Sequence, residues 1–282
     1  MAIVQMQRIN ICALKKNRKA ILERLQELGA MEIDIQLEDD NLGEKQDVAS
    51  SRALFERRAQ TADQALAILN TYVPEKKGML DSLAGKPLVE KELFEKAAEN
   101  QDQYMATASR IVTLDKQIAE SKAAVLKVQN QVEALAPWLS LTVPVSYTGT
   151  QKTAVLIGTM PNPQDQQSIL NLLAGAVPDV EAVDVELIST DKDFTYLAVI
   201  CMKQDAGKVE EVLRTGGFSK PSSPVQKIPE EYKKDLEAEI AKAQEEAKQL
   251  ESELAECAVS GQDLELISDY YRTRAEKFRI LG

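Results

Sequence analysis

Few residues in this chain have both the type and the spacing that chemistry requires. Histidine is absent from all 282 residues, which removes the usual general base, the commonest metal ligand and the usual pH switch. The three cysteines, Cys12, Cys201 and Cys257, lie far apart and form no CxxC or other metal-ligand pattern. We therefore interpret them as reduced intracellular thiols.

Two short stretches come closest to a ligand-binding motif. LAGKPL (83–88) is similar to the end of a phosphate-binding loop, but Leu80 stands where the first glycine belongs and Pro87 where Ser or Thr belongs. LEDD (37–40) could ligate a hard cation, yet it lacks the spacing of a calcium loop, so we favour a solvated loop. The sequence predicts no catalytic, cofactor-binding or metal-binding residue, and no enzyme activity of the chain itself.

The composition excludes several partners. The net charge of −11 argues against nucleic acid and against a bare anionic membrane surface, because both are bound by clustered Lys and Arg. The longest apolar runs, such as 196–202, are far shorter than a membrane span, and the N-terminus is too polar for a signal peptide. The chain as given is expected to be soluble and cytoplasmic.

A heptad pattern is the strongest structural signal. Small and apolar residues recur with alternating steps of three and four through 111–135 and again through 236–264. The first seam contains Ile111, Leu114, Ile118, Val125, Val128, Val132 and Leu135. The second contains Leu236, Ile240, Leu250, Leu254 and Leu264, with Ala243, Ala247, Cys257 and Gly261 between them. Because so narrow a stripe needs a partner helix and the two helices flank one compact region, we predict an antiparallel coiled coil.

Charge favours the same pairing. Residues 230–269 hold 13 acidic residues and 4 lysines, a net of −9, whereas 105–127 hold four basic and two acidic residues, a net of +2. Opposite signs beside the two seams select this partner and disfavour pairing of the acidic helix with itself. Gly261 after Ser260 is a weak point where the return helix could bend, and a third helix (48–72) could lie alongside.

Two small α/β lobes are predicted at the ends of the helices. Near the N-terminus, a strand (3–14), a helix (17–28) ended by Gly29 and a strand (30–37) form a small βαβ unit or half of a split one. The far lobe has a strand (153–160), a helix capped by Asn162, a hairpin (180–190 and 194–203) and a helix opened by Asp205. Trp138 would anchor this lobe at its entrance, and Tyr270 and Tyr271 could be core or contact residues, of which we favour core residues. The order predicts a ferredoxin-like split βαβ lobe with a short or irregular last strand.

These elements predict an α+β chain shaped like an elongated dumbbell. The expected divisions are a proximal lobe (1–47), outgoing helices (48–136), a distal lobe (137–227) and a returning helix (228–282). After Pro87, the absence of Gly and Pro up to Pro137 predicts one continuous outgoing helix.

The order of elements and three stretches carry a family resemblance. Residues 1–33 (MAIVQMQRINICALKKNRKAILERLQELGAMEI), 155–164 (VLIGTMPNPQ) and 264–279 (LELISDYYRTRAEKFR) resemble subunit I of bacterial and archaeal V/A-type ATPases, the counterpart of subunit a of eukaryotic V-ATPase. The resemblance implies a non-catalytic stator component of a rotary ATPase or ATP synthase that moves protons or sodium ions, linking the peripheral stalks to the membrane ion path and resisting torque.

The implied partners are the E/G peripheral-stalk heterodimers at both lobes and the central-stalk socket subunit (C/d) beside the proximal lobe. In the family, a membrane domain beside the rotor ring follows this region. The sequence stops at Gly282, so we expect a fragment of an integral membrane protein of the cytoplasmic face, with one strand of the proximal lobe missing. No ion-translocating residue carries over.

Two alternatives remain open at this point. An SMC-like coiled-coil and hinge module would need basic DNA-facing patches, which the net charge disfavours. A ligand-responsive or enzymatic ferredoxin-like domain in 138–225 would bind a small molecule. We favour the stator interpretation over both.

Overall fold

The computed structural model describes residues 7–29, 49–74, 89–222 and 224–281. They divide into two compact units, one of Met1–Asp115 with Ser252–Gly282 and the other of Lys116–Glu251. Long helices and one small antiparallel sheet make up the secondary structure, so the predicted α+β class is confirmed.

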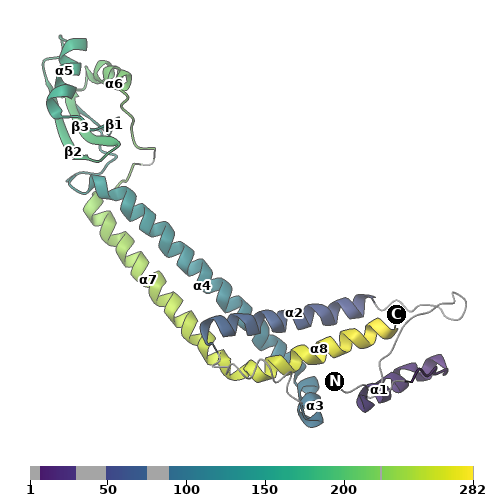
Figure 1. The fold of residues 1–282 in the computed structure, drawn as a ribbon. Coiled ribbons are helices and arrows are strands. Elements are labelled where there is room, and N and C mark those ends of the chain that lie inside the picture. The colour runs from purple at the N-terminus through teal and green to yellow at the C-terminus, as the bar shows by residue number, and fades with distance from the viewer. Residues whose placement is uncertain (1–6, 30–48, 75–88, 223, 282) are drawn as a thin grey trace, which may run out of the picture. The chain divides into compact units, whose positions relative to one another are not determined.

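In the described residues of the first unit, all the regular elements are helices. Its complete elements are η1 (Lys15–Asn17), α1 (Arg18–Leu28), α2 (Ala49–Tyr72), α3 (Lys91–Glu99), η3 (Cys257–Ser260) and α8 (Gly261–Leu281). It also includes the start of α4 (Gln101–Leu135) and the end of α7 (Pro229–Glu256). α2 and α8 pack against each other side by side (Figure 1). Small buried residues on α2, namely Ala59, Ala62 and Ala65, permit this close approach.

Both predicted long helices are interrupted. The outgoing helix ends at Glu99 and restarts at Gln101, so the prediction of one continuous helix is wrong. Asn100 makes the break because its backbone N–H and its side-chain amide both bond to the carbonyl of Lys96, at 3.0 and 3.1 Å. The return helix changes to the 3-10 segment η3 immediately before Gly261, where the sequence predicted a bend.

The N-terminal elements are partly as predicted. α1 forms, and Gly29 follows it with a left-handed φ of +59°, a conformation that suits glycine at the end of a helix. The predicted strand 3–14 does not form over residues 7–14, which are exposed and have no neighbouring strand among the described residues to pair with. The predicted strand 30–37, the acidic stretch 37–40 and the stretch 83–88 lie outside the described residues.

The second unit contains the sheet. Its elements are η2 (Ala136–Trp138), β1 (Thr153–Pro161), α5 (Gln166–Ala176), β2 (Val183–Thr190), β3 (Phe194–Met202) and α6 (Ala206–Thr215). The strands are antiparallel in the order β1-β3-β2, and Ser219 forms a single bridge to Thr159 of β1. With Ser219 in the place of a fourth strand, the order is that of a split βαβ fold, and the predicted irregular last strand is confirmed.

Each face of the sheet has its own core. On one face, α5 and α6 contribute Ile169, Leu173, Val209 and Leu213. On the other, Trp138 packs with Val145, Ile157 and Ala198, and its ring meets Tyr196 edge-on with centroids 5.0 Å apart. Trp138 is therefore a buried residue of this lobe, as predicted.

The helix start predicted at Asn162 is wrong by three residues. Asp165 caps α5, since its carboxylate accepts the backbone N–H of Ser168 at 2.6 Å, and this bond lowers the pKa of Asp165. Asn162 instead has a φ of +63° and turns the chain out of β1. α6 follows Asp205 as predicted.

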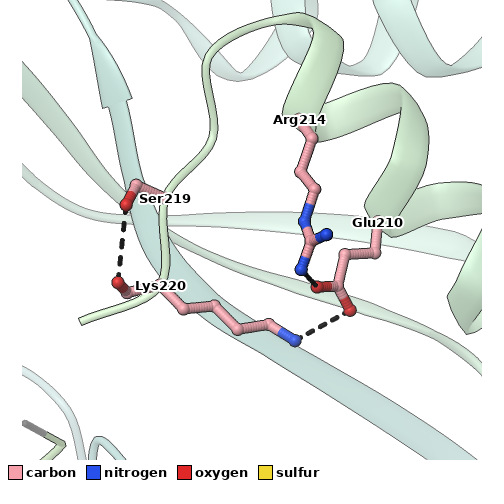
Figure 2. A network of polar contacts seen from close by, with 4 residues as sticks. All are labelled: Glu210, Arg214, Ser219 and Lys220. Atoms are coloured by element: carbon pink, nitrogen blue, oxygen red, sulfur yellow. Dashed lines mark hydrogen bonds and ion pairs between the residues drawn. The ribbon is translucent and has the colours of Figure 1, made fainter. Parts of the chain in front are cut away.

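A charged network fastens the end of the sheet to α6 (Figure 2). The carboxylate of Glu210 accepts hydrogen bonds from Lys220 at 2.7 Å and from Arg214 at 2.6 Å. The bond from Lys220 lowers the pKa of Glu210. Because Lys220 follows Ser219, the network holds the bridging residue against β1.

Candidate functional site: two helix pairs

The predicted seam residues are mostly covered. On α4, Ile111, Leu114, Ile118, Val128 and Leu135 are buried, and Val125 and Val132 are half-buried. On α7, Leu236 and Leu254 are buried, and Ile240 and Leu250 are half-buried. Leu264 is buried on α8, whose main neighbour is α2. The predicted second seam is thus divided between two helices by η3.

Ion pairs connect α4 to α7, which run side by side (Figure 1). Arg110 contacts Glu253 at 2.9 Å in the first unit, and Lys122 contacts Glu251 at 2.7 Å in the second. Both pairs are largely exposed, so each contributes at most about 1 kcal/mol. In both pairs α4 supplies the basic residue and α7 the acidic one, as the net charges of the two stretches predict.

A buried tyrosine joins three helices of the first unit. The hydroxyl of Tyr271 accepts a hydrogen bond from Arg58 of α2 at 3.0 Å and donates one to Gln101 of α4 at 3.2 Å. The Arg58 guanidinium also lies over the Tyr271 ring, 5.4 Å from its centre. We call these three residues the Tyr271 clasp. Burial raises the pKa of Tyr271, so its hydroxyl remains a neutral donor.

A second polar contact lies further along the same helix pair. Asp63 of α2 accepts hydrogen bonds from Ser268 and Arg272 of α8, each at 2.6 Å. Ser268 is buried, so Asp63 satisfies a hydroxyl that water cannot reach.

Aromatic rings fill the space around the clasp. Phe55 lies 6.0 Å from Tyr271 and 5.3 Å from Phe278, and the guanidinium of Arg274 lies over the rings of Phe55 and Tyr270. Tyr271 is fully buried whereas Tyr270 is half-buried, so the prediction of core residues is confirmed for Tyr271.

A buried lysine of α8 pairs with a carboxylate of α1. Lys277 is 5% exposed, and its ammonium contacts Glu23 of α1 at 2.5 Å. The hydrogen bond from Lys277 holds the pKa of Glu23 below its ordinary value. This contact attaches α1 to α8.

The contacts described above hold helices together. Over the described ranges, no group of three or more His, Cys, Asp or Glu side chains is arranged to hold a metal ion. Burial raises the pKa of the Cys201 thiol, which disfavours its reactive thiolate. Within the same ranges, no helix has an apolar stretch that could cross a membrane.

Sequence reasoning predicted the seams but missed the clasp. Heptad spacing is visible in one sequence, whereas Arg58, Gln101 and Tyr271 are separated by long stretches and have no shared spacing. The only available signal was the rarity of aromatic residues, 5% of the chain, against their concentration at 270–278.

The architecture defines a class of protein: long helices paired by seams and a small split βαβ lobe between them. A crystal structure of the cytoplasmic N-terminal domain of subunit I, homolog of subunit a, of V-ATPase has the same fold, with a TM-score of 0.50 over 94% of this chain and 84% of that chain. The two sequences are 17% identical. No family model and no curated protein sequence matches the chain. The resemblance inferred from three sequence stretches is therefore confirmed at the level of the fold.

Proposed function

We propose that this chain is a non-catalytic stator component of a rotary V/A-type ATPase or ATP synthase. The observation that carries the proposal is the shared fold with the subunit I domain over 94% of the chain. The three sequence stretches that resemble the same family support it independently.

The contacts suit a part that resists twisting. Apolar seam contacts keep paired helices together but are non-directional, so they resist separation better than sliding. Hydrogen bonds have a preferred distance and angle, so the Tyr271 clasp and the Asp63 contacts oppose sliding of α8 along α2. In a stator, the seams would maintain the helix pairs and these polar contacts would maintain their register.

The proposed partners follow from the family. The proximal lobe (1–47) and the distal lobe (137–227) would bind E/G stalk heterodimers, and the proximal lobe would also adjoin the central-stalk socket subunit (C/d). The seam residues would connect the two lobes at the cytoplasmic face of the membrane, beside the parent protein's membrane domain and the rotor ring.

Binding to purified E/G heterodimer tests the proposal. The full chain should show saturable binding by calorimetry, and an unrelated acidic coiled coil should show none. Absence of binding by the full chain would overturn the proposed partnership. A parallel titration with duplex DNA should show no binding, whereas affinity that falls steeply with salt would favour the SMC-like alternative.

A further inference from the structure

The outer edge of β2 is closed by side chains. β2 is the last strand in the order β1-β3-β2, and no described strand covers its outer side. An edge strand presents unpaired backbone N–H and C=O groups, which pair readily with a strand of another molecule. Whether the outward N–H and C=O groups of β2 are free or already hydrogen-bonded therefore decides whether the lobe can associate through its sheet.

The backbone N–H and C=O of Val185 face the outer edge of the sheet, and both are already hydrogen-bonded to side chains. Its N–H donates to the Asp184 carboxylate at 2.9 Å, and its C=O accepts from the side-chain amide of Gln166 at 2.5 Å. Gln166 is the first residue of α5, so the cap of this helix also sets the position of the blocking amide. We call Asp184 and Gln166 the edge lock.

The distal part of the same edge is blocked differently. A bulge between Leu187 and Ser189 shifts the pairing with β3. The carbonyl of Ile188 beside it accepts from the Ser140 hydroxyl at 3.2 Å, and the Ser189 hydroxyl donates to the carbonyl of Pro137 at 2.8 Å. A bulge bends an edge strand away from a flat incoming strand.

We propose that the edge lock prevents β2 from pairing with β2 of a second copy of this chain. A symmetric antiparallel pair centred on Val185 would exchange both of its backbone bonds between the two copies. Those are the two bonds that Asp184 and Gln166 occupy within one chain. The lock makes the self-complementary interface unavailable while leaving the internal ladder to β3 unchanged.

A matched pair of double variants tests the lock in the full chain. Asp184→Ala with Gln166→Ala frees both groups of Val185. The control, Glu186→Ala with Gln167→Ala, removes the same charge and an identical amide from neighbouring exposed positions; the Gln167 amide bonds to Asn171 of the same helix. Sedimentation equilibrium should show a concentration-dependent, twofold rise in mass for the lock variant relative to the control. The proposal is overturned if the lock variant and the control have equal masses, whether both remain monomeric or both associate to the same extent.

A third substitution distinguishes strand pairing from loss of folding. Val183→Pro, added to the lock variant, removes an outward N–H at the first residue of β2, a position where strands tolerate proline. It should return the mass to that of the control. Fluorescence of Trp138, the only tryptophan, verifies the lobe's fold in every variant. Hydrogen exchange at the Val185 amide provides a second readout. At low protein concentration, this amide should exchange faster in Asp184→Ala than in Glu186→Ala. Equal exchange rates in the two variants would overturn the proposed lock.

Discussion

The α2–α8 pair and the α4–α7 pair are held by different kinds of contact. α2 and α8 meet through small alanines, a buried tyrosine and hydrogen bonds that join individual side chains. α4 and α7 have a repeating apolar seam with exposed ion pairs beside it. The first pair is specified at a few positions, whereas the second is specified by periodicity.

The difference separates the sources of affinity and of register. A heptad seam tolerates exchange of one apolar residue for another, because burial depends mainly on area. A buried hydroxyl tolerates little change, because its partners are left unsatisfied when it is removed. We therefore expect single substitutions to affect the α2–α8 pair more than the α4–α7 pair.

Tyr271→Ala should produce the largest effect. Removing a fully buried aromatic side chain costs about 3–5 kcal/mol, and Tyr271→Phe should cost about 1–3 kcal/mol because Arg58 and Gln101 lose their partner. Urea unfolding followed by far-UV circular dichroism measures the helices, and Trp138 fluorescence should show an unchanged transition of the sheet lobe. Tyr270→Phe is the matched control. A cost for Tyr270→Phe equal to that for Tyr271→Phe would contradict the clasp.

A charge in the α4–α7 seam should come next. The seam pattern alone treats Val128 and Leu250 as equivalent, yet Val128 is 6% exposed and Leu250 is half-buried. Val128→Asp should destabilise the pair by about 3 kcal/mol, at the upper end of common single substitutions, and Leu250→Asp by less. Limited proteolysis of α4 and α7 should be faster in Val128→Asp. Faster cleavage in Leu250→Asp would show that exposure does not rank these positions.

The ion pairs offer a comparison by salt. Asp63→Ala should cost about 1–3 kcal/mol, because the buried Ser268 hydroxyl loses its acceptor. Glu251→Ala breaks only an exposed contact to Lys122 and should cost under about 1 kcal/mol. High salt should reduce the Glu251 effect more than the Asp63 effect in the same unfolding assay. Equal costs at all salt concentrations would remove the distinction between the two pairs.

Acid should weaken the attachment of α1 by the smallest amount. The pKa of Glu23 lies below its ordinary value of 4.5 because Lys277 donates to it, so its contribution is complete above that value and is lost as the pH falls through the folded-state pKa. At neutral pH, Glu23→Gln should cost about 1 kcal/mol, because the amide oxygen of Gln still accepts a hydrogen bond from the buried Lys277 ammonium and only the charge of a half-exposed carboxylate is lost. Wild type and variant should converge in strong acid. A difference that grows with acidity would contradict this assignment.

Features that depend on repeating or local sequence patterns could be predicted from the sequence, whereas those that depend on one individual side-chain contact could not. Alternation and turn residues correctly predicted the hairpin around 191–193 and the α6 start at Asp205, because these signals are local. Asn100 ended a helix without Gly or Pro nearby, through a side-chain bond that propensity does not reveal. The N-terminal segment shows the opposite error: alternation in 7–14 predicts a strand, but no strand among the described residues pairs with it.

The four residues of η3 change the rotation of α8 about its axis relative to an uninterrupted α-helix. A 3-10 helix turns about 120° per residue and an α-helix about 100°, so four residues turn the following helix about 80° beyond its uninterrupted course. That rotation redirects the apolar stripe of α8, which carries Leu264, Ile267 and Tyr271 toward α2. A one-residue insertion there would turn the stripe by a further angle of about 100–120°, depending on whether the added residue is α-helical or 3-10. The length of this segment, more than its composition, therefore selects the helix that α8 faces.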